Sequence, residues 1–490
     1  MTVTALVLGP IVVGFLLYAL PRSAESLAKI VAAVVAAVTF LLAVFDPHAS
    51  DASVRWLSRP FAAAFHLGFG PLSYWLVVLL AVATFSAVLA LSGPRARGIA
   101  AQLLVLQGAM NGVFLAKDLL LFALFWDLML IPVFIVMVGT SNHARPAWKY
   151  LIYNLIGGLA LLLATAAYGV VAGTTDVIGS PGNGGTVGAT WGFWIFAGYA
   201  LAFLIKTPVF PFHTWMPDTY AELPAPVVAV VSAVQSKAGL YGFLMITLPL
   251  LGAQMHQARP LMFALGLISL LYGGFTALAE RDAKRVVAYS SLSHLGLILL
   301  AVFSGQQLAY EGAAVYMVAH GFFSAALFLA LGAVEQREET RDLGRLGGLG
   351  ARNPRLAGAL LLGALAALGL PGLAGFAGEI LILTGLFQGG FVWPAIVALI
   401  PIVLASAYML RLFQGIMNGP EVPDLPERRD LTWAEGIAIA PLVAGFVWFG
   451  VNPGPVITQA STIGTHQRQP LAVTPASTLV PEGSRVVGSR

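Results

Sequence analysis

The sequence predicts an all-α protein, a polytopic transmembrane helix bundle with about 14 spans. Of its 490 residues, 58% are hydrophobic and only 10% are charged, and the mean hydropathy is +0.86. Soluble domains carry about 25% charged residues. Apolar runs of roughly 20 residues, the length that a helix needs to cross hydrocarbon, follow one another along most of the chain. Several soluble domains, which the length alone would suggest, are therefore excluded.

Composition also excludes several kinds of site. The chain has no cysteine, so it holds no disulfide and no Cys-ligated iron–sulfur or zinc centre. Its net charge of +4 does not indicate a nucleic-acid surface. The first 20 residues lack a basic n-region and an Ala-x-Ala-type cleavage site, so they are expected to be a spanning helix. The glycine-rich stretch 179–188 lacks a Walker-type Lys-Ser/Thr and is expected to be an outer loop rather than a phosphate site.

The predicted spans are 2–20, 26–45, 71–92, 98–116, 119–139, 150–172, 191–209, 224–249, 260–279, 284–303, 309–333, 355–386, 392–415 and 432–450. The seventh runs into Pro208 and Pro211, and the twelfth is interrupted by the glycine-rich segment 369–375. The twelfth is too long for one crossing and is expected to form two half-helices. Broken helices at membrane depth are tolerated only where the backbone is buried in protein or lines a wet cavity.

The interruptions divide the chain. They recur five spans apart, and an odd number of spans per unit implies two units that are inverted relative to each other, as in many transporters. The predicted organisation is 1–97 with N-terminal helices 1–3, 98–250 as a first transport unit of helices 4–8, 251–415 as a second of helices 9–13, 416–452 with the final helix, and 453–490 as an outer polar tail. The tail is expected to be disordered or laid on a partner.

The distribution of lysine and arginine predicts the orientation. With the N-terminus outside, 17 of the 26 Lys and Arg residues fall in inner loops, 7 fall in outer segments, and Lys206 and Lys237 lie within spans. Short cytoplasmic loops carry such an excess of positive charge. Both termini are therefore predicted on the outer side.

Three ionisable residues in the first unit are flanked by apolar residues: Asp127, Lys206 and Lys237. Each costs about 2.5–3.5 kcal/mol on insertion scales, so such groups usually face a partner, a cavity or an ion path. We interpret them as a proton relay. The alternatives are structural: a carboxylate held by one cation for Asp127, a lysine bonded to carbonyls freed by the prolines for Lys206, and a helix-packing lysine tied to Ser236 or Gln235 for Lys237.

The second unit supplies His294, His320 and Glu379. A lone histidine is more often a satisfied core residue, but beside buried lysines a neutral imidazole can pass protons with serine hydroxyls and water. Glu379 follows the second break, where it would be the terminal relay acid or would cap the second half-helix. No His or carboxylate pair has metal-binding spacing within a span, so no metal site is expected. Near the seventh break, His213, Asp218 and Glu222 would form an entry funnel or serve as caps and anchors.

Four segments carry a resemblance to a known family: Phe125-Trp-Asp-Leu-Met-Leu-Ile-Pro-Val, Ala202-Phe-Leu-Ile-Lys-Thr-Pro-Val-Phe-Pro-Phe-His-Thr-Trp-Met-Pro-Asp, Lys284-Arg-Val-Val-Ala-Tyr-Ser-Ser-Leu-Ser-His-Leu-Gly and Leu370-Pro-Gly-Leu-Ala-Gly-Phe-Ala-Gly-Glu. In this order, over about residues 70–415, the chain resembles the antiporter-like proton-channel subunits of respiratory complex I (NADH:quinone oxidoreductase). It is most similar to the M-type, because Glu379 stands where the L- and N-type subunits usually carry lysine. The same module occurs in Mrp-type sodium/proton antiporters and membrane-bound hydrogenases.

The resemblance implies a role for each relay residue. Asp127 and Lys206 would be the acid–lysine pair of the first half-channel, Lys237 the central lysine, His294 and His320 the connecting relays, and Glu379 the exit site. Family members usually carry glutamate where this chain has Asp127. Aspartate is one methylene shorter, which implies a bridging water or a helix shift between it and Lys206.

The resemblance also implies the setting. This chain would hold no cofactor and do no redox chemistry, while NADH, FMN, iron–sulfur clusters and quinone would be bound by partner subunits. Its partners would be lipid, protons and other membrane subunits, including L- and N-type ones, in the bacterial inner membrane. A multisubunit sodium/proton antiporter, a membrane-bound hydrogenase and a non-conducting scaffold remain the alternatives.

Overall fold

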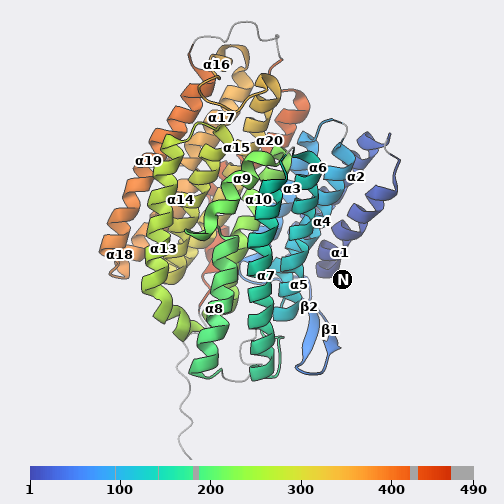
Figure 1. The fold of residues 1–490 in the computed structure, drawn as a ribbon, viewed down its shortest axis with the longest axis vertical. Coiled ribbons are helices and arrows are strands. Elements are labelled where there is room, and N and C mark those ends of the chain that lie inside the picture. The colour runs from blue at the N-terminus through green and yellow to red at the C-terminus, as the bar shows by residue number, and fades with distance from the viewer. Residues whose placement is uncertain (22, 94, 142, 180–186, 420–428, 465–490) are drawn as a thin grey trace, which may run out of the picture.

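The structure, a computed structural model, describes residues 1–21, 23–93, 95–141, 143–179, 187–419 and 429–464. Within them, 13 helices are long and apolar enough to cross a membrane. Figure 1 shows them as a bundle along the long axis of the molecule. Two shorter apolar helices, Pro354–Ala367 and Ala374–Gln388, correspond to the two half-helices predicted for the twelfth span. The predicted polytopic helical bundle is confirmed.

The helices follow the predicted spans closely. The first group is α1 (Thr2–Leu16), α2 (Glu25–Phe45), α3 (Ser73–Ala90), α4 (Ala96–Leu115), α5 (Leu119–Leu128), α6 (Leu130–Thr140) and α7 (Ala144–Ala172). The middle group is α8 (Ala189–Lys206), α9 (Trp215–Glu222), α10 (Ala225–Ala233), α11 (Ala238–Gly242) and α12 (Leu248–Leu250). The last group is α13 (Gly252–Ala279), α14 (Ala283–Phe303), α15 (Gln307–Glu338), α16 (Leu349–Arg352), α17 (Pro354–Ala367), α18 (Ala374–Gln388), α19 (Val392–Met417), α20 (Trp433–Val451) and α21 (Gly454–Ala460).

Both predicted interruptions are present. α8 ends at Lys206, and α9 begins at Trp215 after an irregular segment that contains Pro208 and Pro211. α17 ends at Ala367, and α18 begins at Ala374. Between them Gly369 and Gly372 adopt positive φ angles of 77° and 93°, which favour glycine because it has no Cβ. The missing proline N–H groups and these glycines explain why neither span is one straight helix.

Two further interruptions were not predicted. The fifth span divides into α5 and α6 at Met129, near Pro132, which cannot donate to the Leu128 carbonyl. The eighth span leaves α-helical geometry at Val234, passes through the 3₁₀ turn Gln235–Lys237, and contains a π-helical turn over Phe243–Thr247. The eighth has no glycine or proline at its break, so the sequence carries no local signal for it.

The loops gather at two ends of the bundle. We call the end with residues 141, 143, 280–285 and 339–353 the basic face, because it carries the predicted inner-loop cations Arg281, Lys284, Arg285, Arg341, Arg345 and Arg352. The opposite end carries a hairpin that was not predicted, of antiparallel strands β1 (Ala52–Leu57) and β2 (Ala63–Leu67), and we call it the hairpin face. The hairpin is joined to its neighbours by backbone hydrogen bonds from Lys117 N to His66 O (2.8 Å) and from Thr175 N to Ala62 O (2.9 Å). Figure 1 shows α16 and the hairpin at opposite ends.

The start of the predicted tail is ordered. α21 packs beside α15, and the Gln307 side chain donates from Nε2 to the Ala460 carbonyl (3.3 Å) and the Ser461 carbonyl (3.1 Å). The rest of that prediction, residues 465–490, and most of the predicted glycine-rich loop, residues 180–186, lie outside the described residues.

Three of the most buried spans carry Lys237, His294 and His320 of the predicted relay. In the spans Ala225–Leu250 and Gln307–Glu338, the 18-residue apolar stretch is completely buried, and in Ala283–Phe303 it is 94% buried. α13 approaches α14 closely because glycines face the contact. A Cβ on Gly273 would lie 2.7 Å from Ser293 N and 2.8 Å from Tyr289 O. Small residues let membrane helices pack this closely.

We expect Gly273→Ala to destabilise the folded protein by about 1–3 kcal/mol, because its new methyl group collides with the α14 backbone. The neighbouring Gly274→Ala is the matched control, since its Cβ would meet Leu404 and Pro401 at an ordinary 3.5 Å. Thermal unfolding of the two purified variants measures the difference. Equal midpoints would mean that close packing at Gly273 is unimportant.

Candidate functional site

The structure places the six predicted relay residues on different helical segments. Five are buried: Lys206 at the end of α8, Lys237 in the 3₁₀ turn of the eighth span, His294 in α14, His320 in α15 and Glu379 in α18. Asp127, near the end of α5, is partly exposed. Their arrangement differs between the two halves of the chain.

Lys237 contacts His320 directly. The Lys237 ammonium is fully buried and lies 2.6 Å from His320 Nδ1. It also donates to the Ser232 carbonyl, one turn earlier at the break in the helix. The predicted alternative had Ser236 or Gln235 as partners, and the structure instead gives Lys237 a titratable neighbour on another helix.

Glu379 and His294 share one tyrosine. The Tyr316 hydroxyl of α15 donates to Glu379 Oε1 at 2.6 Å and lies 2.6 Å from His294 Nδ1. α18 begins at Ala374 and has no side-chain cap, so Glu379 lies beyond the first turn of that helix. Its carboxylate contacts Tyr316 and the Gly369 backbone in the break, rather than acting as the helix cap that was the alternative.

The second nitrogen of His294 extends this chain of contacts. His294 Nε2 lies 3.0 Å from Ser290 Oγ, which lies 3.1 Å from the Tyr408 hydroxyl of α19. An ionised Glu379 can only accept, so Tyr316 donates to it and accepts from His294 Nδ1. His294 Nε2 then accepts from Ser290, and Ser290 accepts from Tyr408. All four bonds point the same way, and a wire of this kind can move a proton by shifting each hydrogen one place.

One discontinuity separates the two groups. His320 Nδ1 accepts from Lys237, so in the neutral ring the proton is on Nε2, and that nitrogen has no hydrogen-bond partner in the structure. The two imidazole centroids are 5.5 Å apart with their planes at 65°. Both nitrogens of His294 are already engaged, so the histidines are in ring contact without a direct hydrogen bond.

Lys206 and Asp127 are close but unpaired. The Lys206 side chain is 1% exposed, and its ammonium, which has no hydrogen-bond partner, lies 5.2 Å from the centroid of the Trp126 ring. Asp127 interacts with it electrostatically, but no ion pair joins the two among the described residues. The Asp127 carboxylate lies against Gly158 of α7, where a Cβ would collide with it. The freed Ile205 carbonyl is bound by the Trp215 indole at 3.0 Å, not by Lys206.

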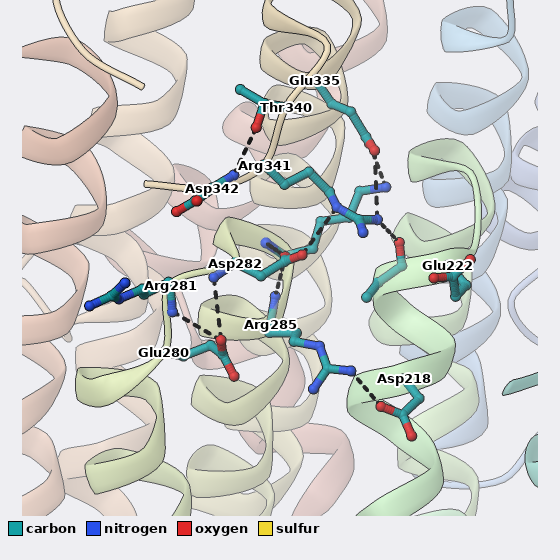
Figure 2. A network of polar contacts seen from close by, with 12 residues as sticks. Asp218, Glu222, Glu280, Arg281, Asp282, Arg285, Glu335, Thr340, Arg341 and Asp342 are labelled. Carbon is teal, nitrogen blue, oxygen red and sulfur yellow. Dashed lines mark hydrogen bonds and ion pairs between the residues drawn. The ribbon is translucent and has the colours of Figure 1, made fainter. Parts of the chain in front are cut away.

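A charged cluster opens on the basic face. Figure 2 shows acidic and basic side chains from α9, the α13–α14 connection and the end of α15 turned toward one another. A cavity of about 750 Å³, which we call the vestibule, is lined by residues such as Glu222, Arg285 and Glu335. Asp218 of α9 bridges Arg285 Nη2 at 2.5 Å and Lys149 Nζ at 2.7 Å.

The three residues predicted near the seventh break therefore have different surroundings. Glu222 lines the vestibule, and Asp218 is an anchor between α7 and α14. His213 is buried between Phe210 and Tyr272, with ring centroids 5.6 Å and 5.1 Å away. Burial, and then the nearby Lys149, lower the pKa of His213 to about 4, so it is neutral at cellular pH.

Sequence reasoning missed the hydroxyl groups that join the relay. Tyr316 precedes His320 by four residues, and Ser290 precedes His294 by four, so each pair lies on one face of its helix. This spacing was a usable signal. Tyr408 had no such signal, because only the packing of α19 against α14 brings it to Ser290.

Comparison with known proteins identifies the family of the chain. Residues 116–405, more than half of the chain, match the family described as NADH:quinone oxidoreductase/Mrp antiporter, TM. The chain is 33% identical over 458 residues to NADH-quinone oxidoreductase subunit M of Rhodobacter capsulatus, covering 88% of each protein. It is 32% identical over 443 residues to the subunit M of Escherichia coli (strain K12), covering 86% of this chain and 85% of that one.

Solved structures have the same fold. A chain of respiratory complex I from Thermus thermophilus superposes with a TM-score of 0.84 at 30% identity, over 95% of this chain and 99% of that one. A chain of the Mrp complex from Dietzia sp. DQ12-45-1b has a TM-score of 0.84 at 21% identity, over 96% and 97%; this second likeness concerns the fold alone. Together with the family match, these similarities show that the chain belongs to the NADH:quinone oxidoreductase/Mrp antiporter transmembrane family.

Proposed function

We propose that this chain is the M-type proton-translocating subunit of a complex I-type NADH:quinone oxidoreductase in a bacterial cytoplasmic membrane. The observation that carries the proposal is the buried set of contacts from Lys237 through His320, His294 and Tyr316 to Glu379. Burying four ionisable groups together at membrane depth is costly, and such clusters typically mark ion or proton paths. The names of the relatives agree with this assignment.

In this mechanism Lys237 exchanges a proton with His320, and the proton reaches His294 when an imidazole reorients or a water molecule bridges the two rings. The aligned bonds through Tyr316 then deliver a proton to Glu379. Lys206 and Asp127 form the other half-channel, and their separation makes a bridging water or a side-chain movement part of each transfer. Redox chemistry takes place on other subunits, which hold NADH, FMN, iron–sulfur clusters and quinone.

The exposure of the lateral surface around Asp127 is an argument for a neighbouring membrane subunit at that surface. Asp127 is partly exposed, and apolar side chains on the same flank are open: Leu124 is 45% exposed and Leu163 72%. A carboxylate at this depth is expensive against lipid, whereas a protein neighbour can supply hydrogen bonds. We infer that another antiporter-like subunit, of the L- or N-type, covers this flank.

Replacing Lys237 by Ala is expected to lower proton pumping of the assembled complex by at least about 100-fold, because the central proton carrier is lost. Lys206→Ala should act similarly. The measurement is the number of protons moved per electron in proteoliposomes. An unchanged ratio in both variants would exclude the relay and favour a non-conducting scaffold.

Tyr316→Phe should slow proton transfer by about tenfold or more, since it disconnects His294 from Glu379. Tyr241→Phe is the matched control, because its buried hydroxyl donates only to the Phe114 backbone carbonyl at 2.7 Å. Both changes should cost about 1 kcal/mol of stability. Pumping rates that fall equally in the two variants would contradict a role for Tyr316 in the wire.

The second candidate is a subunit of a sodium/proton antiporter, because the Mrp complex has the same fold at the same TM-score. The proposed function predicts that the natively purified complex contains flavin and iron–sulfur signals by absorption and electron paramagnetic resonance. Absence of both, together with sodium-dependent proton exchange, would favour the antiporter. A nickel signal would instead indicate a hydrogenase.

A further inference from the structure

The half-helix α9 links the two lysines of the proposed relay. It follows the break after Lys206, and α10 leads from it to Lys237. The chain between the lysines passes through α9, with irregular backbone on both sides of it, so a displacement of this short helix is transmitted to the segments that carry the lysines. The contacts that hold α9 in place are therefore expected to affect the proposed relay.

Three cations from the basic face hold α9, one at its first turn and two at its C-terminal end. Lys284 Nζ donates to the Leu223 carbonyl at 3.2 Å, and Arg285 pairs with Asp218 at 2.5 Å. Arg341 Nη1 donates to the Ala221 carbonyl. The last carbonyls of a helix lack partners within the helix and carry its negative dipole end, so cations are favoured there.

These cations come from one bracket, which we define as residues 281–285 with 341–343. Its two segments are joined by backbone hydrogen bonds from Ala283 N to Arg341 O and from Leu343 N to Arg281 O, both 2.9 Å. Asp282 caps α14 through Lys284 N at 2.9 Å and pairs with Arg341 Nε at 3.1 Å. The bracket thus connects α9 to the start of α14 and to the segment that follows α15.

Lys284 is the buried member of the three. Its side chain is 3% exposed, and its ammonium lies 2.6 Å from Glu335 Oε2 of α15. The Glu335 side chain is 34% exposed and lines the vestibule, where its other oxygen lies 3.6 Å from Arg341 Nη1. Figure 2 shows Glu335 turned toward Arg341. Glu335 therefore supplies the charge partner that lets Lys284 remain buried against the Leu223 carbonyl.

We propose that Lys284 and Glu335 are positioning residues for proton transfer: they hold the end of α9 and thereby set the geometry between Lys206 and Lys237. This inference rests on the proposed function. It assigns a role to a buried lysine that the relay itself does not use. Because Lys284 acts through a backbone carbonyl, its contribution depends on charge and reach rather than on exchanging protons with the relay.

The test compares variants in the intact complex reconstituted into liposomes. Lys284→Met is expected to lower the proton-pumping rate about tenfold, the scale of effect produced by small misplacement of reacting groups. It should also shift the pH profile of pumping, because both relay lysines change their surroundings. Lys284→Arg, which keeps the charge and the reach, should restore most of the rate.

Arg281→Met is the matched control. Arg281 lines the same vestibule and has the same charge, but its side chain forms no ion pair among the described residues. It should pump as the wild type does. Equal losses in Arg281→Met and Lys284→Met would overturn the proposal, since they would show an effect of vestibule charge alone.

A double variant separates positioning from misfolding. Lys284→Met alone leaves Glu335 with Arg341 as its remaining partner, and Glu335→Gln alone leaves the buried Lys284 ammonium without its ion pair, whereas the double variant Lys284→Met with Glu335→Gln removes both charges of that pair. The double variant should assemble and still pump about tenfold more slowly. Wild-type pumping by an assembled double variant would overturn the proposal. Failure of the wild type to pump, or normal pumping by Lys206→Ala, would instead refute the proposed function.

Discussion

Ionisable groups at membrane depth are the constraint on which this structure depends. Each is expensive in hydrocarbon, so each must face protein, water or another ionisable group. The bundle meets this requirement by placing its most buried helices at the centre and directing their polar side chains toward one another. Lys237, His320, His294 and Glu379 share one buried region for this reason. Asp127, which is partly exposed, is the exception that points to a neighbouring subunit.

Broken helices make this arrangement possible. A regular helix offers no free carbonyl to a buried cation, whereas the break in the eighth span lets Lys237 donate to the Ser232 carbonyl. The break in the twelfth places Gly369 against the Glu379 carboxylate. At the break in the seventh, the Lys206 ammonium lies beside the Trp126 ring and forms no hydrogen bond with the described residues. Lys206 and Lys237 therefore have different surroundings in the two breaks.

The basic face contributes a second set of contacts, which hold α9 rather than forming part of the proposed relay. The cations there hold one half-helix at its carbonyl end, in the geometry that helix termini favour. Arg285 and Arg341 line the vestibule, whereas Lys284 is buried beside it. The relay and its support are therefore separate sets of residues, joined through the backbone of α9 and α10.

The sequence by itself determined the membrane class, the approximate number of spans and both proline- and glycine-marked breaks, and it singled out the six ionisable residues of the proposed relay, because hydropathy, helix breakers and charge within apolar runs are local signals. Tertiary structure alone decided which of them meet. No local pattern marks the break at Val234, the hairpin over 52–67 or the arrival of Tyr408 at Ser290. The contacts of Tyr316 and the gap between Asp127 and Lys206 likewise depend on how helices pack, since each is set by distances of a few ångströms between segments far apart in the chain.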